Sequence, residues 1–357
     1  MNVLGVLSGT SADGIDLGLC RIEAGRPIYL TAFETFPFPA ALQDKLRHLP
    51  GRSAPLAQLA TLQNQLDAAF AQAVNRFRAQ HRDPVELIGF HGQTLWHDPR
   101  HGSSWALGSA AALAARTGVP VVAGFRDSDL ALGGQGAPLA PLFHAELFAH
   151  LPKPAALVNI GGIANVTLLL PDGRIQGWDT GPGNGIIDEL MQHHFGQPFD
   201  QDGATAARGR VNDGLLATLL RHPYFSEAPP KSTGREQFNR AWFARLQDTP
   251  LAPEDQVATA AALTVETIAR ALASVGAKTV VLMGGGAHNT TLQALLQAHL
   301  PEAEFFDLKK VGDPPVDAIE AMLFAWLAWK RWHNEAVDYT AITGAARPGL
   351  YGSVWQA

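Results

Sequence analysis

Polar turns separate short apolar runs at the start of the chain. Apolar stretches at about 2–8, 15–22 and 27–35 each have the length and composition of a β-strand. The turns between them are short, so the pattern predicts an antiparallel meander. The first turn ends in Asp13-Gly14, a pair typical of hairpins because both turn positions must tolerate a positive φ.

A similar pattern recurs about 150 residues later. An apolar strand at 155–160 leads into the small-residue turn 161–165, and apolar strands follow at 166–170 and 175–178. Identity between the two copies is low, so what repeats is the order of strands and turns. Two similar halves, each with a glycine-containing hairpin, predict two lobes that face one cleft.

Helical periodicity alternates with further apolar strands. Apolar residues recur at three- and four-residue spacing between Pro55 and His81, which marks the buried face of a long helix. Strands are expected at 86–90, 119–124 and 279–283, and helices near 108–117, 186–191, 254–275 and 314–333. The mixture of strands and helices indicates an α/β fold.

The length of 357 residues exceeds what one ordinary core organises, so two domains are expected. Residues 127–141 are rich in Gly and Pro and lack periodicity, which places the passage between the domains there. We expect an N-terminal lobe at 1–130, completed by about 335–357, and a C-terminal lobe at 131–334. Residues 127–136 are then candidates for a hinge.

Composition narrows the class of protein. The net charge is −6, from 27 Lys and Arg against 33 Asp and Glu, and no long basic run occurs, so no nucleic-acid partner is expected. Cys20 is the single cysteine, which rules out an internal disulfide and a cysteine metal cluster. A signal peptide and a stretch of about 18 apolar residues are both missing, so we expect a soluble, cytoplasmic protein with no membrane partner.

Three glycine-rich turns follow predicted strands, at 9–14, 161–165 and 284–286. Such turns let a flat or phosphorylated ligand approach the backbone, and the first also offers the hydroxyls of Thr10 and Ser11. The chain has no P-loop motif and no G-x-G-x-x-G after its first strand. The turns therefore indicate a nucleotide or polyphosphate site of another type.

Polar strings follow two other predicted strands. His91-Gly92-Gln93-Thr94 comes after the strand at 86–90, and Asp179-Thr180-Gly181-Pro182-Gly183-Asn184 comes after the strand at 175–178. Open α/β sheets bind ligands beyond the carboxyl ends of their strands. Asn184 is a candidate cap for the next helix. Asp179 is either an Asx turn or cap, or a general base in the cleft, and we favour the base because buried carboxylates without strong partners are rare.

Two further pairs of residues have competing interpretations. His91 and His97 could bind a metal ion, but their spacing matches no common ligand set. Lys231 and Arg235 lie in a loop with Gly and Pro. They are either solvated or grip an anionic group of a substrate, for which Arg offers a bidentate fork.

Several strings resemble the anhydro-N-acetylmuramic acid kinase family. They cover nearly the whole chain in order and are Ser8-Gly9-Thr10-Ser11-x-Asp13-Gly14-Ile15-Asp16, His91-Gly92-Gln93-Thr94, Phe125-Arg126, Asp179-Thr180-Gly181-Pro182-Gly183-Asn184, Pro229-Pro230-Lys231-Ser232-Thr233-Gly234-Arg235-Glu236, Gly284-Gly285-Gly286-x-x-Asn289, Glu320-Ala321-Met322 with Phe324-Ala325-Trp326, and Thr343-Gly344-Ala345. The resemblance implies a two-lobed actin/hexokinase/Hsp70-like (ribonuclease H-like) α/β fold. It also implies ATP in the interlobe cleft, with Mg²⁺ on its phosphates.

A specific reaction follows from the resemblance. ATP, water and 1,6-anhydro-N-acetylmuramic acid would give N-acetylmuramic acid 6-phosphate and ADP, a step in the recycling of cell-wall peptidoglycan. Members of the family are typically homodimers, so a homodimer is expected here.

The resemblance also assigns roles to residues. Asp179 corresponds to the base that activates water. The residues implied for ATP are Gly9, Thr10, Ser11, Ala12, Asp13, Gly14, Ile15, Asp16, Gly161, Gly162, Gly284, Gly285 and Gly286. The residues implied for the sugar are Thr94, Arg126, Thr180 and Glu320, and either Asp13 or Asp16 could reach Mg²⁺.

Two other functions stay open. The protein could be another sugar kinase of the same fold, in which Asp179 deprotonates a substrate hydroxyl. It could also be a regulator or chaperone-like ATPase that binds ATP without turning over a sugar. The substrate-side strings at 91–94 and 229–236 argue against the regulator.

Overall fold

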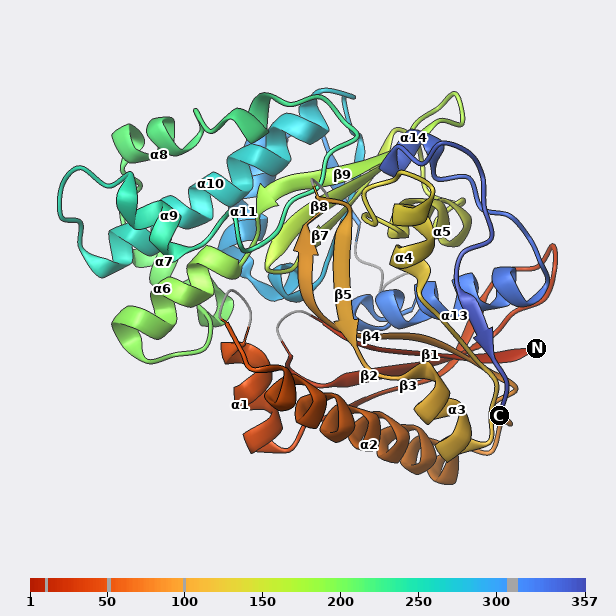
Figure 1. The fold of residues 1–357 in the computed structure, drawn as a ribbon. Helices are drawn as coiled ribbons and strands as arrows, with labels where there is room; N and C mark the ends of the chain where they lie inside the picture. Colours follow the sequence, from red (N-terminus) through yellow and green to blue (C-terminus); the bar gives the residue numbers. More distant parts are fainter. Residues whose placement is uncertain (10–11, 50–52, 99–100, 307–313) are drawn as a thin grey trace. The chain divides into compact units, whose positions relative to one another are not determined.

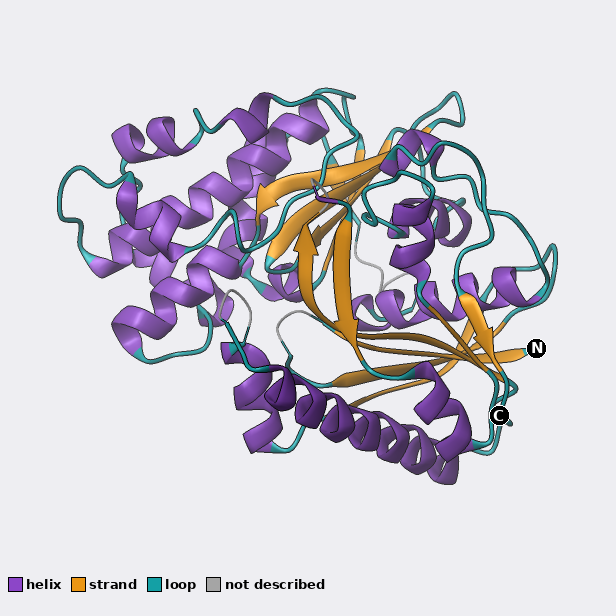
Figure 2. Ribbon diagram, in the orientation of Figure 1, coloured by secondary structure: helices purple, strands orange, loops and turns teal. Residues whose placement is uncertain are grey.

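The chain forms two compact α/β units in the computed structural model, which describes residues 1–9, 12–49, 53–98, 101–306 and 314–357 (Figure 1). The first unit comprises Met1–Leu147 and Ala318–Ala357, and the second comprises Phe148–Asp317. Each unit combines one β-sheet with helices (Figure 2). Among the described residues, no helix is long and apolar enough to cross a membrane.

The seven-stranded sheet of the first unit begins with the expected meander. Strands β1 (Asn2–Ser8), β2 (Ile15–Arg21) and β3 (Tyr29–Phe36) pair in antiparallel fashion. Strands β4 (Leu87–Asp98) and β6 (Val121–Ala123) continue the sheet in parallel with β1, giving the order β12-β6-β4-β1-β2-β3. The remaining strands are β5 (Ser103–Leu107), paired with β4, and β12 (Ser353–Trp355) at the edge.

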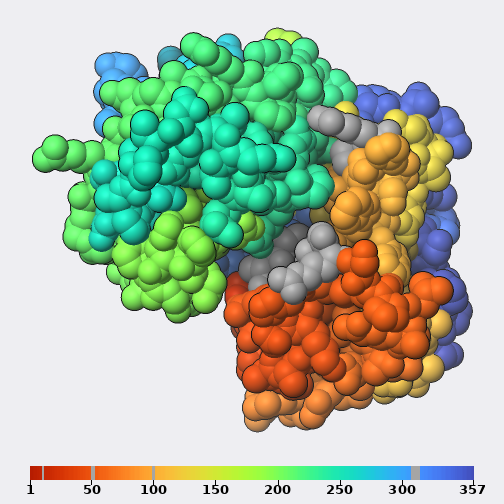
Figure 3. All heavy atoms as spheres, turned by 60° about the vertical axis from the view of Figure 1, so that its left-hand side comes forward, coloured from red at the N-terminus to blue at the C-terminus, as the bar shows by residue number. Residues whose placement is uncertain are grey.

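Helices cover both faces of this sheet. Helices α1 (Ala40–His48), α2 (Leu56–Gln80) and α3 (Ala110–Thr117) share one hydrophobic core with β1, β2 and β4. The polar sides of α1 and α2 form part of the unit's surface, coloured red to orange in Figure 3. Helix α13 (Ile319–Trp332) packs on the opposite face, and α4 (Phe125–Ala131), α5 (Ala140–Leu147) and α14 (Thr340–Thr343) complete the unit.

Helix α13 lies directly on the backbone of the sheet. Gly5 in β1 pairs with Gly18 in β2 and with Gly89 in β4, so three glycines form a row across the sheet. A Cβ atom at Gly5 would overlap the carbonyl oxygen of Ala321, and one at Gly89 would overlap that of Phe324. We call Gly5, Gly18 and Gly89 the glycine row. It allows a backbone-to-backbone approach that no larger residue would permit.

The second unit repeats the topology of the first. Strands β7, β8 and β9 form an antiparallel meander, and β10 and β11 continue in parallel with β7, giving the order β11-β10-β7-β8-β9. This order matches β6-β4-β1-β2-β3 of the first unit, so the repeat predicted from the sequence is confirmed at the level of strands. The strand bounds are Ala155–Ile160, Ile163–Leu169, Ile175–Pro182, Thr279–Met283 and Glu304–Phe305.

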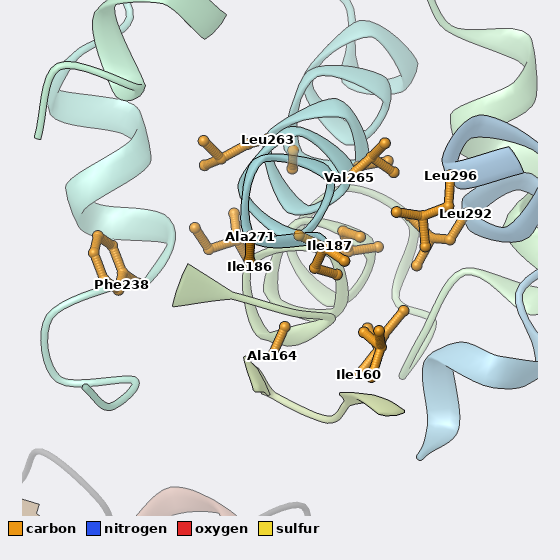
Figure 4. Close-up of a cluster of buried hydrophobic side chains, with 14 of the residues drawn as sticks. Ile160, Ala164, Ile186, Ile187, Phe238, Leu263, Val265, Ala271, Leu292 and Leu296 are labelled. Atoms are coloured by element: carbon orange, nitrogen blue, oxygen red, sulfur yellow. The ribbon is translucent and has the colours of Figure 1, made fainter. Parts of the chain in front are cut away.

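A second hydrophobic core joins the helices of this unit to its sheet. Helix α10 packs on β8 and β9, and it carries Leu263 and Val265 into a cluster with Ile160 and Ile187 (Figure 4). The helices are α6 (Gly185–Phe195), α7 (Ala204–Arg208), α8 (Asp213–Leu219), α9 (Arg240–Arg245), α10 (Pro253–Ala273) and α11 (Thr290–His299). The 3₁₀ helices are η2 (Gln201–Gly203), η3 (Pro223–Ser226), η4 (Gly285–His288) and η5 (Val316–Ala318).

Two strands are longer than expected. Strand β4 continues through Asp98, because Gln93 pairs with Ser8 in β1 and with Leu107 in β5. Strand β9 likewise continues through Pro182, with Asp179 opposite Asn165 of β8. The polar strings that begin at His91 and Asp179 therefore start inside strands and not beyond their ends.

The contact-defined units also differ from the expected lobes. The chain passes to the second unit after Leu147 and returns after Asp317, and α13 belongs to the first unit because it packs on β1 and β4. The segment 127–136, expected as a hinge, is tied down within the first unit. The buried carboxylate of Asp129 accepts hydrogen bonds from Gly136 N, Thr343 Oγ1 and Tyr351 OH, at 2.7, 2.7 and 2.8 Å.

Candidate functional site

Residues 9–14 form the loop between β1 and β2, although Thr10 and Ser11 lie outside the described residues. Among the described residues of this loop, Ala12 has a positive φ, at 53°, and Asp13 and Gly14 do not, so the turn type predicted for that pair is wrong. Gly14 is required for a different reason, since a Cβ there would lie 2.7 Å from Thr35 Cγ2. Side-chain amides support the loop: Gln93 Nε2 donates to Gly9 O at 3.0 Å.

The two acidic residues of this segment have different surroundings. Asp13 is exposed and forms an ion pair with Arg47. Asp16 lies at the start of β2, opposite Leu7, and accepts a hydrogen bond of 2.6 Å from Thr35 Oγ1. Ser8 ends β1 beside them, and its buried Oγ has no partner among the described residues. Asp16 and Ser8 thus offer oxygen ligands where the loop begins and ends.

A histidine and an arginine meet in the first unit. His91 Nε2 lies 3.3 Å from Arg126 Nε and 3.2 Å from Thr94 Oγ1, and the His91 ring stacks on Phe324 with centroids 4.3 Å apart. Burial, together with the charges of Arg126 and His97, holds the pKa of His91 well below its ordinary value. The neutral imidazole can therefore accept from Arg126. Arg126 Nη1 also donates to the carbonyl of Gly136 at 2.8 Å.

His97 is buried in the same region. Burial and the Arg126 charge lower the pKa of His97 to about 3, while Asp98 opposes the change. Both of its ring nitrogens are buried and have no hydrogen-bond partner among the described residues. Within these residues, no group of three His, Cys, Asp or Glu side chains could hold a metal ion.

Glu320 stands in the first turn of α13, where the glycine row fixes the helix against the sheet. Glu320 is exposed, but the surrounding protein atoms remove part of the water around its carboxyl group and so raise its pKa. The charge of Arg126 lowers this pKa, and the charge of Asp16 raises it further. These couplings bring Asp16, Arg126 and Glu320 into one region of the first unit, and Thr94 joins it through His91.

Asp179 occupies a defined row of the second sheet. It lies opposite Asn165 in β8, which lies opposite Asn159 in β7, which in turn lies opposite Met283 in β10. The adjacent row contains Trp178 and belongs to the hydrophobic core. Because side chains alternate along a strand, Asp179 lies on the face opposite that core.

The backbone around Asp179 is held from three directions. Thr233 N donates to Asp179 Oδ2 at 2.9 Å, Tyr224 OH donates to the Asp179 carbonyl at 2.6 Å, and Asp179 N donates to Lys231 O at 3.3 Å. Asp179 as a residue is only 6% exposed. Thr180 is also buried, and its hydroxyl donates to Ala164 O at 3.2 Å. Asp179 is therefore not a helix cap.

The glycine turns of the second unit meet at this end of the sheet. The carbonyl of Gly161 accepts from Asn184 N at 2.7 Å, and the carbonyl of Gly162 accepts from Gly183 N and Gly185 N, each at 3.0 Å. Asn184 occupies the N-cap position of α6, as expected, but its side chain donates to Ile160 O at 3.1 Å and makes no capping hydrogen bond to the helix.

The turn after β10 joins the same cluster. A Cβ at Gly286 would overlap the side chain of Ile160, and one at Gly284, where φ is 72°, would overlap Asn159. Gly285 lies beside Asn184, with 3.8 Å from its ideal Cβ position to Asn184 Nδ2. The turns 161–162 and 284–286, far apart in sequence, thus form one backbone surface.

Lys231 is buried, whereas Arg235 remains partly exposed. Lys231 is 8% exposed and its Nζ donates to Tyr224 O at 2.9 Å. Arg235 pairs with Glu189 at 2.9 Å. The sequence did not single out Tyr224, Thr233 or Glu189. Tyr224 lies in a segment with no periodicity, and the backbone contact of Thr233 leaves no signal in a single sequence.

Comparison with known proteins identifies the family. The family model "Anhydro-N-acetylmuramic acid kinase" matches residues 1–357. The protein of that name from Sulfurovum sp. is 40% identical over 99% of this chain and 98% of its own length. The one from Xylella fastidiosa is 42% identical over 99% of this chain and 96% of its own length.

Solved structures show a more distant similarity. The activator of 2-hydroxyisocaproyl-CoA dehydratase from Clostridium difficile is 16% identical, with a TM-score of 0.42 over 95% of this chain and 99% of its own. A ROK family glucokinase from Streptomyces griseus is 15% identical, with a TM-score of 0.41 over 92% of this chain and 100% of its own. The full-length sequence matches are decisive, and the chain belongs to the anhydro-N-acetylmuramic acid kinase family and is an ATP-dependent kinase.

Proposed function

We propose that this kinase opens 1,6-anhydro-N-acetylmuramic acid with water and phosphorylates O6, giving N-acetylmuramic acid 6-phosphate and ADP in peptidoglycan recycling. Membership of the family supports the substrate. The mechanism rests on one structural observation: the Asp179 carboxylate is buried and accepts a hydrogen bond of 2.9 Å from Thr233 N.

The chemistry requires a base. The anhydro sugar has no free 6-hydroxyl, because O6 is joined to C1. Water attacks C1, the C1–O6 bond breaks, and O6 takes the γ-phosphoryl group of ATP as ADP leaves. The attacking water gives a proton to Asp179, and C1 keeps its hydroxyl, so atoms and charges balance.

The contacts of Asp179 suit that task. The hydrogen bond from Thr233 N fixes the plane of the carboxylate, and the backbone contacts to Tyr224 and Lys231 hold the strand on which it stands. A base whose geometry is set before the substrate arrives needs little reorganisation during the reaction.

ATP is assigned to the glycine turns by their shape and the family resemblance. Residues 9–16 of the first unit would contact the phosphates, the turn 161–162 of the second unit would also contact phosphate, and the turn 284–286 would lie against adenosine. The turns 161–162 and 284–286 consist of glycines and so carry no side-chain bulk, which is what a phosphate or a flat base requires.

Mg²⁺ would act on the phosphates of ATP and neutralise charge during transfer. Asp16 fits this role better than Asp13. Asp16 accepts a hydrogen bond from the Thr35 hydroxyl and stands opposite Leu7, the residue before Ser8, whereas Asp13 is exposed and forms an ion pair with Arg47. Magnesium commonly needs only one or two carboxylates when a substrate supplies phosphate oxygens.

The sugar would contact Thr94, Arg126, Thr180 and Glu320. Arg126 and Thr94 are held together through His91, which supports their use as one recognition group. Arg126 offers a cation for the carboxylate of the lactyl group of the sugar. A homodimeric state is a further prediction that rests on the resemblance, and the cytoplasmic location expected from the sequence also stays a prediction.

Product analysis in ¹⁸O-water tests the proposal. Purified protein, ATP, Mg²⁺ and 1,6-anhydro-N-acetylmuramic acid should give a 6-phosphorylated sugar that carries one ¹⁸O at C1. Phosphorylation without ¹⁸O would indicate an ordinary sugar kinase. Bound ATP with no sugar product would contradict the proposed substrate and favour the regulator.

A further inference from the structure

Lys231 is an unusual lysine because its ammonium group is buried. The residue is 8% exposed. Its Nζ donates to the carbonyl of Tyr224 at 2.9 Å and lies 4.6 Å from the centroid of the Tyr224 ring. Burying a charged group costs free energy unless partners compensate for the lost water. A carbonyl and an aromatic face recover only part of that cost, so a further role for the charge is expected.

The contacts of Lys231 lead back to Asp179. Lys231 binds the carbonyl of Tyr224, the Tyr224 hydroxyl donates to the carbonyl of Asp179 at 2.6 Å, and Asp179 N donates to the carbonyl of Lys231 at 3.3 Å. The three residues therefore close a ring of hydrogen bonds that joins β9, η3 and the loop at 229–236.

Charge couples the same residues. Burial lowers the pKa of Lys231, while the carboxylates of Glu227 and Asp179 favour its charged form. The interaction between two charges is mutual, so the ammonium also favours the ionised form of Asp179. Glu227 and Asp179 are the carboxylates that act on Lys231, and Thr233 N donates a neutral hydrogen bond to the Asp179 carboxylate.

We propose that Lys231 is a positioning residue whose buried ammonium keeps Asp179 ionised and, with Tyr224, holds it in place for proton transfer. This inference rests on the proposed role of Asp179 as the base. Lys231 itself contacts no substrate in this proposal. It acts through the Asp179 carboxylate and backbone, and its effect is greatest where Asp179 begins to take up a proton.

Lys231→Met tests the charge. Without the cation Asp179 binds a proton more readily, so the acid limb of the kcat/KM profile should move to higher pH by about 0.5–1 unit. Lys231→Gln keeps a donor for the Tyr224 carbonyl but loses the charge, and should give the same shift. Lys231→Arg keeps the charge, so its acid limb should lie close to that of the wild type. KM for ATP should not change in any of the three variants.

Lys278→Met is the matched control. Lys278 is exposed and directly precedes β10, at the opposite end of the strand from Met283, which shares a row with Asp179. This variant loses the same formal charge and should leave the acid limb in place. A shift of equal size in Lys278→Met would show a general charge effect and overturn the proposal.

The outcomes separate this inference from the proposed function. If Asp179→Asn retains turnover, the base assignment fails. If Asp179→Asn is inactive but the acid limb of folded Lys231→Met and Lys231→Gln stays unmoved, the base stands and the role of Lys231 is overturned. Failure of both uncharged variants to fold, judged by circular dichroism, would make Lys231 a structural residue and also overturn the proposal.

Discussion

Asp179 Oδ2 accepts a hydrogen bond of 2.9 Å from the backbone N–H of Thr233, which lies 54 residues further along the chain. A backbone donor has no rotamer to lose, so this contact fixes the carboxylate more firmly than a flexible side chain would. The loop at 229–236 therefore helps to position Asp179. This contact gives a physical reason for the resemblance of that loop to the family.

Replacing Asp179 by Asn should abolish most turnover. The amide oxygen can still accept from Thr233 N, but the side chain can no longer take a proton from water, so kcat should fall roughly 10²–10⁴-fold. Calorimetry should show ATP binding close to that of the wild type. An unchanged kcat would remove Asp179 from the role of base.

Asp16 and Asp13 provide a matched pair for the role of magnesium. Asp16→Asn should raise the Mg²⁺ concentration needed for half-maximal activity by about 10-fold or more, since loss of a supporting carboxylate commonly costs that much metal affinity. Asp13→Asn should have little effect, because Asp13 is paired with Arg47. Magnesium titrations of initial rate make the comparison, and the reverse order of effects would reassign the carboxylate.

The stability of the protein should fall in mild acid, in part because of His144. Burial lowers the pKa of this imidazole from 6.5 to about 3, so it is neutral in the folded protein at neutral pH. The unfolded chain binds a proton below about pH 6.5, but the folded protein does so only near pH 3. The free energy of unfolding should therefore decrease as the pH falls through that window, by at most about 1.4 kcal/mol per pH unit for one group.

His144→Gln isolates this contribution. Urea unfolding of the variant between about pH 6.5 and pH 5 should show a weaker dependence on pH than that of the wild type. Identical slopes for the two proteins would mean that His144 is not held neutral by the fold.

The glycine row is open to a direct test of stability. Gly89→Ala places a Cβ against the Phe324 carbonyl. The free energy of unfolding should therefore decrease by about 1–3 kcal/mol or more, and the midpoint of thermal unfolding should fall. Gly214→Ala is the control, because it stands in α8 with only Asn212 Oδ1 nearby, at 3.4 Å, and should be neutral or slightly stabilising. Equal effects in the two variants would contradict the close approach of α13.

Local pattern predicted the strands and helices well, because alternation and helical spacing are properties of neighbouring residues. It ended β4 too early, since the pairing of Gln93 with Leu107 depends on a partner outside the apolar run. It also placed α13 in the wrong half, because the reason for its position is three glycines on β1, β2 and β4 and not its own apolar face.

The candidate site was predictable only in part. Asp179 was favoured as a base from its place at the end of a predicted strand, and Arg126 and Glu320 were identified from strings that resemble a family. Their proposed roles stay predictions. The burial of Lys231 and its link to Tyr224 were not foreseen, because a lysine in a Gly- and Pro-containing segment usually faces solvent. These contacts form because residues 224–233 pack against β9, and a pattern of neighbouring residues does not predict such long-range packing.

The glycine row has a mechanical consequence. Between most helices and sheets lies a layer of side chains that can shift and absorb a small displacement, but α13 rests on the backbone of β1 and β4. A displacement at one end of α13 should therefore be transmitted directly to β1 and β4. We therefore expect Glu320 at the start of the helix, the loop after β1 and the polar string on β4 to move together as one rigid body.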